Sequence, residues 1–220
     1  MAFIDVLIYL KEIFFLWLSL FIAPLENLNM LWILLPVIIN WGFTEFYQEK
    51  KGTNLGNAIT NGVVALLVAV DWLRTSTGEF GEGQITIGLL VTYLIITGLM
   101  AIYGILIIVW GIRLKKRVRY IGRVREVTYL TLMFTPVIYG IIPLSMNVIA
   151  AIIVFFPLFY FVVEILDRLA PDPKTYQEED NEKEYKDKLF TDVENQPPMF
   201  QAEQGNQSTG FNQYSNYPKL

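Results

Sequence analysis

The sequence contains no cysteine and no histidine. Disulfides, thiol nucleophiles, Cys/His zinc sites and haem ligation by histidine are therefore excluded. A histidine proton relay is excluded as well, and neither Ser19 nor Ser145 has a histidine to activate it. No glycine-rich phosphate-binding motif is present. We expect no enzyme activity, no metal and no cofactor.

Charge is scarce for a chain of 220 residues. Only 17% of the residues are charged, whereas 54% are hydrophobic. Apolar runs of roughly 20 residues are long enough to cross a bilayer. The sequence predicts an all-α, multi-pass membrane helix bundle (1–170) with six transmembrane helices, at 3–23, 29–48, 56–73, 85–112, 126–142 and 144–166.

The basic residues predict the orientation of these spans. The loop RLKKRVRYIGRVR at 113–125 has seven basic residues and no acid, so the positive-inside rule makes it cytoplasmic. Counting the spans from it makes the loops 25–29 and 75–84 external. Both termini are then expected inside. The first residues have no basic stretch or cleavage site, so we expect no removed signal peptide.

An alternative topology concerns the first span, because Lys11 and Glu12 fall at its middle. Residues 1–12 could instead lie flat at the membrane surface as an amphipathic helix, with a tilted span beginning near Ile13. A charge inside the bilayer is costly. If the first helix spans the membrane, Lys11 and Glu12 would therefore each require a partner of opposite charge.

The composition changes after residue 170. Residues 171–220 carry ten of the acidic and five of the basic residues, and the last part is rich in Gln and Asn. Glu→Lys pairs at i,i+4 predict a short charged helix near 175–194. The remainder has too little apolar surface to fold alone, so we expect a disordered cytoplasmic tail.

A polar stretch, NWGFTEFYQEKKGTNLGNAITNG, joins the second and third spans. Its residues repeat at helical spacing, so the two polar faces are expected to meet. They could bond the helices together, or they could line a polar cavity open to the cytoplasm. With the first span included, the predicted polar intramembrane face consists of Lys11, Glu12, Asn40, Thr44, Glu45, Asn57, Thr60, Asn61 and Asp71.

Two further sets of residues have a simple expected role. Small residues at helical spacing in the fourth span predict close helix packing: Thr97, Ala101, Gly104 and Gly111. The basic loop is expected to bind anionic lipid headgroups through Arg113, Lys115, Lys116, Arg117, Arg119, Arg123 and Arg125. Because two flanking spans hold this loop at the lipid surface, we expect no nucleic-acid binding.

These observations favour a non-catalytic scaffold or subunit of a membrane complex, with a protein partner or a homo-oligomer. The alternative is a channel or transporter for an ion or small solute, with a polar cavity between the first three helices. The two hypotheses differ in whether the polar face is wet or sealed by protein.

Overall fold

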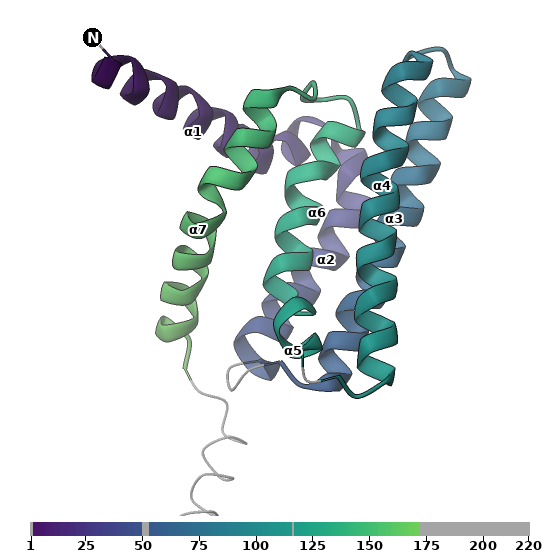
Figure 1. Cartoon of the computed structure of the whole chain (residues 1–220), viewed down its shortest axis with the longest axis vertical. Coiled ribbons are helices and arrows are strands. Elements are labelled where there is room, and N and C mark those ends of the chain that lie inside the picture. The colour runs from purple at the N-terminus through teal and green to yellow at the C-terminus, as the bar shows by residue number, and fades with distance from the viewer. Residues whose placement is uncertain (1, 50–52, 116, 172–220) are drawn as a thin grey trace, which may run out of the picture. The chain divides into compact units, whose positions relative to one another are not determined.

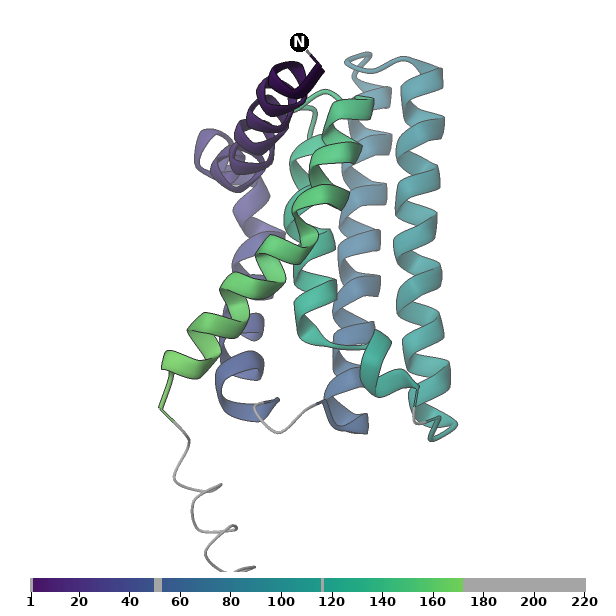
Figure 2. The ribbon, with the colours of Figure 1, turned by 60° about the vertical axis from the view of Figure 1, so that its left-hand side comes forward.

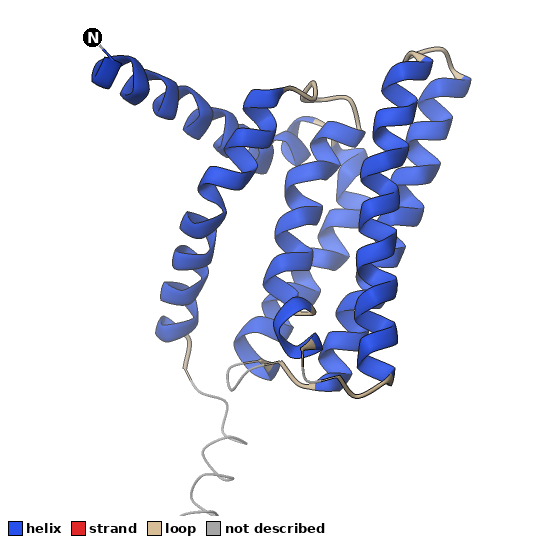
Figure 3. Ribbon diagram, viewed as in Figure 1, coloured by secondary structure: helices blue, strands red, loops and turns tan. Residues whose placement is uncertain are grey.

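The computed structural model describes residues 2–49, 53–115 and 117–171, and the predicted tail helix and disordered tail lie outside them. Helices are the regular elements of this described part (Figure 3). All of them belong to one compact unit, Met1–Asp172. In order they are α1 (Ala2–Glu26), η1 (Leu28–Met30), α2 (Leu31–Phe43), the π-helix η2 (Thr44–Gln48), α3 (Leu55–Gly81), α4 (Ile87–Ile112), α5 (Val118–Ile121), α6 (Val124–Ile138) and α7 (Met146–Leu169).

Five helices of the described part are long and apolar enough to span a membrane, which indicates a multi-pass membrane protein. They are Phe3–Glu26, Leu28–Gln48, Leu55–Gly81, Ile87–Ile112 and Met146–Leu169. The expected span at 126–142 is not among them. The helix there, α6, has 15 residues, and at 1.5 Å per residue it is about 22 Å long, less than the roughly 30 Å of hydrocarbon in a bilayer.

The third helix is longer than expected, and most of the predicted 75–84 loop is helical. α3 continues to Gly81 because local hydrogen bonds satisfy its polar side chains. The Ser76 hydroxyl donates to the Trp72 carbonyl at 2.7 Å, and the Thr77 hydroxyl donates to the Leu73 carbonyl at 2.7 Å. Serine and threonine are compatible with a helix interior when they bond back to the preceding turn.

α3 and α4 form a long antiparallel pair (Figure 2). The buried residues of α4 include Tyr93, Thr97, Met100, Gly104, Ile107 and Gly111, which are spaced alternately by four and three. That spacing places them on one helix face. Another face of α4 is exposed and apolar, as expected of a surface that faces lipid, and it includes Val91, Ile95, Leu99, Ile102 and Leu106.

Glycines allow the two helices to approach closely. A Cβ atom on Gly104 would lie 2.8 Å from the Gly62 carbonyl oxygen, and one on Gly62 would lie 2.9 Å from the Gly104 carbonyl oxygen. A Cβ on Gly111 would collide with Ile59. The small-residue stripe therefore lies at the contact between α3 and α4 within one chain.

The short helix α6 lies at the centre of the described unit, and α1, α2, α3 and α7 all pack against it (Figure 1). None of its residues is exposed. The Tyr129 hydroxyl accepts a hydrogen bond from Trp17 of α1 at 3.1 Å and donates to the Ile152 carbonyl of α7 at 2.6 Å. The indole N–H of Trp72 on α3 donates to the Thr135 hydroxyl at 3.0 Å. These bonds join α6 to three of its neighbours.

α1 differs from the expected antiparallel span, because it runs across the other helices rather than along them. In Figures 1 and 2 both of its ends lie toward the end of the bundle where α3 turns into α4. Its second half packs on the core through Ile13, Trp17 and Leu20, whereas every residue from Phe3 to Glu12 is exposed.

We predict that Gly104→Ala destabilises the protein, because the added methyl group meets the backbone of α3. The matched control is Gly98→Ala on the same helix, where a Cβ meets nothing within 4 Å. In a helix, alanine is favoured over glycine by about 1 kcal/mol, so the control should be neutral or stabilising. Thermal unfolding in detergent measures both, and equal behaviour of the two variants would contradict the packing described above.

Candidate functional site

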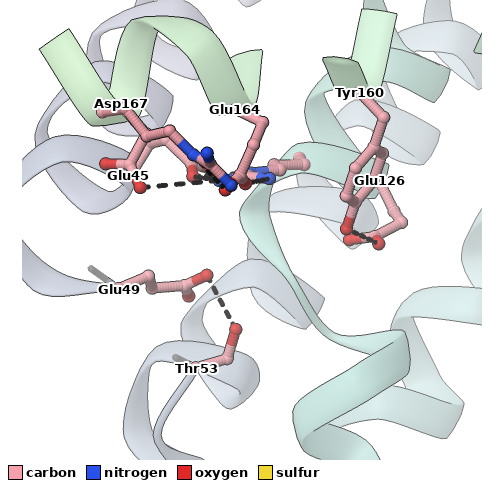
Figure 4. Close-up of polar contacts among 9 residues, drawn as sticks. Glu45, Glu49, Thr53, Glu126, Tyr160, Glu164 and Asp167 are labelled. Atoms are coloured by element: carbon pink, nitrogen blue, oxygen red, sulfur yellow. Dashed lines mark hydrogen bonds and ion pairs between the residues drawn. The ribbon is translucent and has the colours of Figure 1, made fainter. Parts of the chain in front are cut away.

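A buried arginine at the start of α6 is the centre of the most strongly charged cluster in the described residues. The guanidinium of Arg125 contacts Glu45 Oε1 through Nε and Nη2, both at 2.6 Å. It also contacts Glu164 Oε2 at 3.1 Å and Asp167 Oδ2 at 3.8 Å. One cation thus faces three carboxylates, which come from η2 and α7 (Figure 4).

The cluster has a sealed side and an open side. The side chains of Arg125 and Glu45 are only 4% and 3% exposed, whereas that of Glu164 is 43% exposed. Charge-assisted contacts between buried groups are strong, but removal of one partner leaves an uncompensated charge. The Arg125–Glu45 pair therefore joins the end of α2 to the start of α6, and the other two carboxylates attach the end of α7.

The π-helix η2, at the end of α2, positions the Glu45 carboxylate. The Glu49 N–H donates to the Thr44 carbonyl, five residues earlier, at 2.8 Å. That is the π-helical pattern, which gives a wider turn than an α-helix. Thr44, Glu45 and Glu49 are all buried. The wide turn accordingly directs two acidic residues toward the protein, Glu45 of the predicted polar face and Glu49, which was not predicted.

A second polar network lies beside the first. Glu49 accepts hydrogen bonds from the Thr53 hydroxyl at 2.8 Å and from the Asn61 amide at 3.2 Å. The same amide nitrogen donates to the Gly122 carbonyl at 2.9 Å. Burial raises the pKa of the Glu49 carboxyl, and these donors oppose that rise. The network closes the α2–α3 connection against the loop that precedes α6.

A third contact extends the polar region along α7. The Tyr160 hydroxyl donates to Glu126 Oε1 at 2.8 Å. The guanidinium groups of Arg123 and Arg125 lie 5.5 Å and 5.1 Å from the centre of the Tyr160 ring, within the range of a cation–π interaction. Together the three contacts make a continuous polar layer at the end of the bundle opposite the α3–α4 turn.

The structure brings together only part of the predicted polar face. Glu45 and Asn61 belong to the polar layer, and Thr44 is buried next to it. Asn40 and Asn57 are half-buried, and Thr60 is exposed with its hydroxyl bonded to the Gly56 carbonyl. The expected meeting of α2 with α3 is minor, because α2 packs mainly against α6.

The other predicted polar residues lie elsewhere. Asp71 is at the opposite end of the bundle, bonded to Tyr139 and Arg74. Lys11 and Glu12 are exposed on α1 and contact no charged group of the described residues.

The basic loop also divides into two parts. Arg113, Lys115, Arg117 and Arg119 are exposed, Arg123 is half-buried, and Lys116 lies outside the described residues. Arg125 differs from the expectation of headgroup binding, because it is buried and paired with carboxylates.

Sequence reasoning missed six members of the polar layer: Glu49, Thr53, Glu126, Tyr160, Glu164 and Asp167. The i,i+3 spacing of Glu164 and Asp167 at the end of the last span places both on one helix face. The sequence places this acidic pair at the same membrane face as the basic loop, but it does not show which basic residue the pair contacts.

No protein-family model, curated protein or solved structure matches the chain. The role of the polar layer is therefore inferred from its geometry. The described residues include no group of three His, Cys, Asp or Glu side chains arranged to hold a metal ion. Its carboxylates are instead paired with a guanidinium, hydroxyls and an amide, an arrangement that joins helices.

We predict that Arg125→Met destabilises the chain by about 3–5 kcal/mol, as is typical when one partner of a buried ion pair is removed. Thermal unfolding in detergent measures the loss. The added substitution Glu45→Gln should recover part of it, because the buried carboxylate is then no longer unpaired.

The control for this prediction is Arg113→Met, which removes an exposed charge from the same loop. It should leave the unfolding temperature nearly unchanged, since exposed charges contribute little to stability. A loss of stability in Arg113→Met as large as in Arg125→Met would show that the cluster has no special role.

Proposed function

We propose that the chain is a non-catalytic scaffold or subunit of a membrane complex, and that its partner binds the exposed first half of α1. One observation carries this proposal: every residue from Phe3 to Glu12 is exposed, and apolar residues lie on all sides of the helix. A helix at a membrane surface has one face in lipid and one in water. The water-facing side of FIDVLIYL would still carry large apolar side chains, and a partner protein would cover them.

The state of the polar face also supports this function over a channel or transporter. A transport path between the first three helices requires wet polar groups. Asn61 is 1% exposed and bonded on both sides, and Glu45 is 3% exposed and paired with Arg125. Protein groups of the same chain thus occupy the Asn61 amide and one carboxylate oxygen of Glu45, two groups that would have lined a path.

A specific topology goes with this proposal. In it α2, α3, α4 and α7 cross the membrane, and α6, which is too short to cross lipid alone, runs through the bilayer inside the bundle, where protein rather than lipid surrounds it. α1 lies along the surface at the α3–α4 end. The support is the crosswise direction of α1 (Figures 1 and 2) and the enclosure of the short helix α6 by its neighbours. The basic loop and the tail are then cytoplasmic, as the positive-inside rule indicates, and the N-terminus is on the opposite side rather than inside.

Cysteine labelling tests this topology directly, because the chain has no native cysteine. We expect an impermeant thiol reagent applied to sealed vesicles to label Phe3→Cys and Lys115→Cys from opposite sides. Thr44→Cys should remain unlabelled from both sides, since Thr44 is 4% exposed. Labelling of Phe3→Cys and Lys115→Cys from the same side would restore the six-span arrangement, and ready labelling of Thr44→Cys would favour a wet cavity.

The function is tested by purification from the native membrane in mild detergent, followed by native mass measurement. We expect a stoichiometric hetero-partner with the unmodified chain. The double substitution Lys11→Leu/Glu12→Leu should reduce its recovery several-fold, because charge pairing with the partner is lost. The control Lys115→Leu, which removes an exposed charge at the other end, should retain the partner. Recovery of the unmodified chain as a lone monomer or a homo-oligomer would contradict the proposal.

A further inference from the structure

A polar cavity of about 870 Å³ opens at the end of the bundle where α3 turns into α4. Three segments form its walls: the connection between α1 and α2, the last turns of α3, and the turn that follows α6. Its location is far along the bundle from the Arg125 cluster, and neither the polar layer nor the exposed half of α1 contributes to it.

Two residues that line the cavity, Arg74 and Tyr139, both contact Asp71, which lies behind the lining. The Tyr139 hydroxyl donates to Asp71 Oδ2 at 2.7 Å, and Arg74 Nη2 contacts Asp71 Oδ1 at 3.0 Å. The Asp71 side chain is 8% exposed and that of Arg74 is 69% exposed. The cation of the cavity is thus already balanced by a buried carboxylate, so it offers an anionic ligand little net attraction.

Two further carboxylates give the cavity a net negative charge. Glu82 Oε2 accepts a hydrogen bond from the Gln84 amide at 2.7 Å. Glu79 Oε2 is buried, and it has no hydrogen-bond partner among the described residues. A buried carboxylate oxygen without a partner is costly, and such groups are often completed by a ligand or water.

An aromatic side chain stands at the edge of the same cavity. Trp32 is 78% exposed, although it is large and apolar. A cavity lined by both a tryptophan and carboxylates is a suitable site for an ammonium group, which the ring attracts through its quadrupole and the carboxylates attract through charge. The described residues provide no set of three carboxylates for a metal ion there.

From these observations we infer that the cavity binds a small ligand through an ammonium group, with Glu79 and Glu82 as its counter-ions and Trp32 as its aromatic wall. The ammonium group belongs either to a free amine or to the headgroup of a zwitterionic lipid. This inference does not depend on the proposed function, because the cavity shares no residue with the exposed half of α1.

The test uses the full chain in nanodiscs of phosphatidylglycerol, which has no ammonium group. Choline and ethanolamine are titrated while binding heat and tryptophan fluorescence are recorded. We expect saturable binding that Glu79→Gln/Glu82→Gln weakens at least about tenfold, since two charge-assisted contacts are lost. Trp32→Leu should also weaken binding. Because Trp32 is exposed, we do not expect this substitution to unfold the protein. The control Glu12→Gln should bind normally.

A second arm separates the two sources of the ligand. Nanodiscs that contain phosphatidylethanolamine are compared with those of phosphatidylglycerol alone. If the zwitterionic lipid blocks choline, or stabilises the unmodified chain but not Glu79→Gln/Glu82→Gln, the ligand is a lipid headgroup. If choline binds without competition, the ligand is a free amine. Binding that the double substitution leaves unchanged, or no response to any of the three probes, would overturn the inference.

Discussion

The buried guanidinium of Arg125 is the interaction on which the arrangement of the described helices depends most. An unpaired charge in this position would be strongly destabilising, so the start of α6 must lie where carboxylates can reach it. Glu45 comes from the end of α2, and Glu164 and Asp167 come from the end of α7. The cluster thus fixes three helix ends at one level. α6 is enclosed by its neighbours above that level, and the hydroxyls of Tyr129, Thr131 and Thr135 are hydrogen-bonded within the bundle.

How much of this fold the sequence could predict depends on the range of the interactions involved. The all-helical class and most helix positions follow from apolar runs that are local in sequence. The α4 stripe is also local, because spacings of three and four place Gly104 and Gly111 on one helix face wherever the partner lies. The length of α3 was missed because Ser76 and Thr77 suggested a turn, and their back-bonding to the helix cannot be inferred from residue type.

The candidate site was much less predictable. Arg125 is 80 residues from Glu45 and 39 from Glu164, and a single sequence gives no information on which charges pair over such distances. Compositional reasoning therefore placed Arg125 with the lipid-binding arginines. The sequence left the direction of α1 open between a span and a helix that lies flat over residues 1–12. Hydropathy reports that a helix is apolar, but its crossing angle is determined by packing of Ile13, Trp17 and Leu20 on the core.

The two ends of the bundle consequently differ in their chemistry. At the end that contains the basic loop, carboxylates, hydroxyls and amides are paired with one another across several helices, and little of that polar surface is open to a ligand. At the α3–α4 end, Asp71 neutralises Arg74, but a carboxylate oxygen of Glu79 remains buried without a partner beside an exposed tryptophan. The basic-loop end also has buried carboxylate oxygens without a hydrogen-bond partner, on Glu45, Glu126 and Asp167. The difference is that Glu79 lines a cavity of about 870 Å³ together with the exposed Trp32, whereas the other three carboxylates lie around Arg125 and Tyr160. The cavity therefore distinguishes the α3–α4 end as the one that is open to recognition, and the paired charges mark the opposite end as the one that holds the helices together.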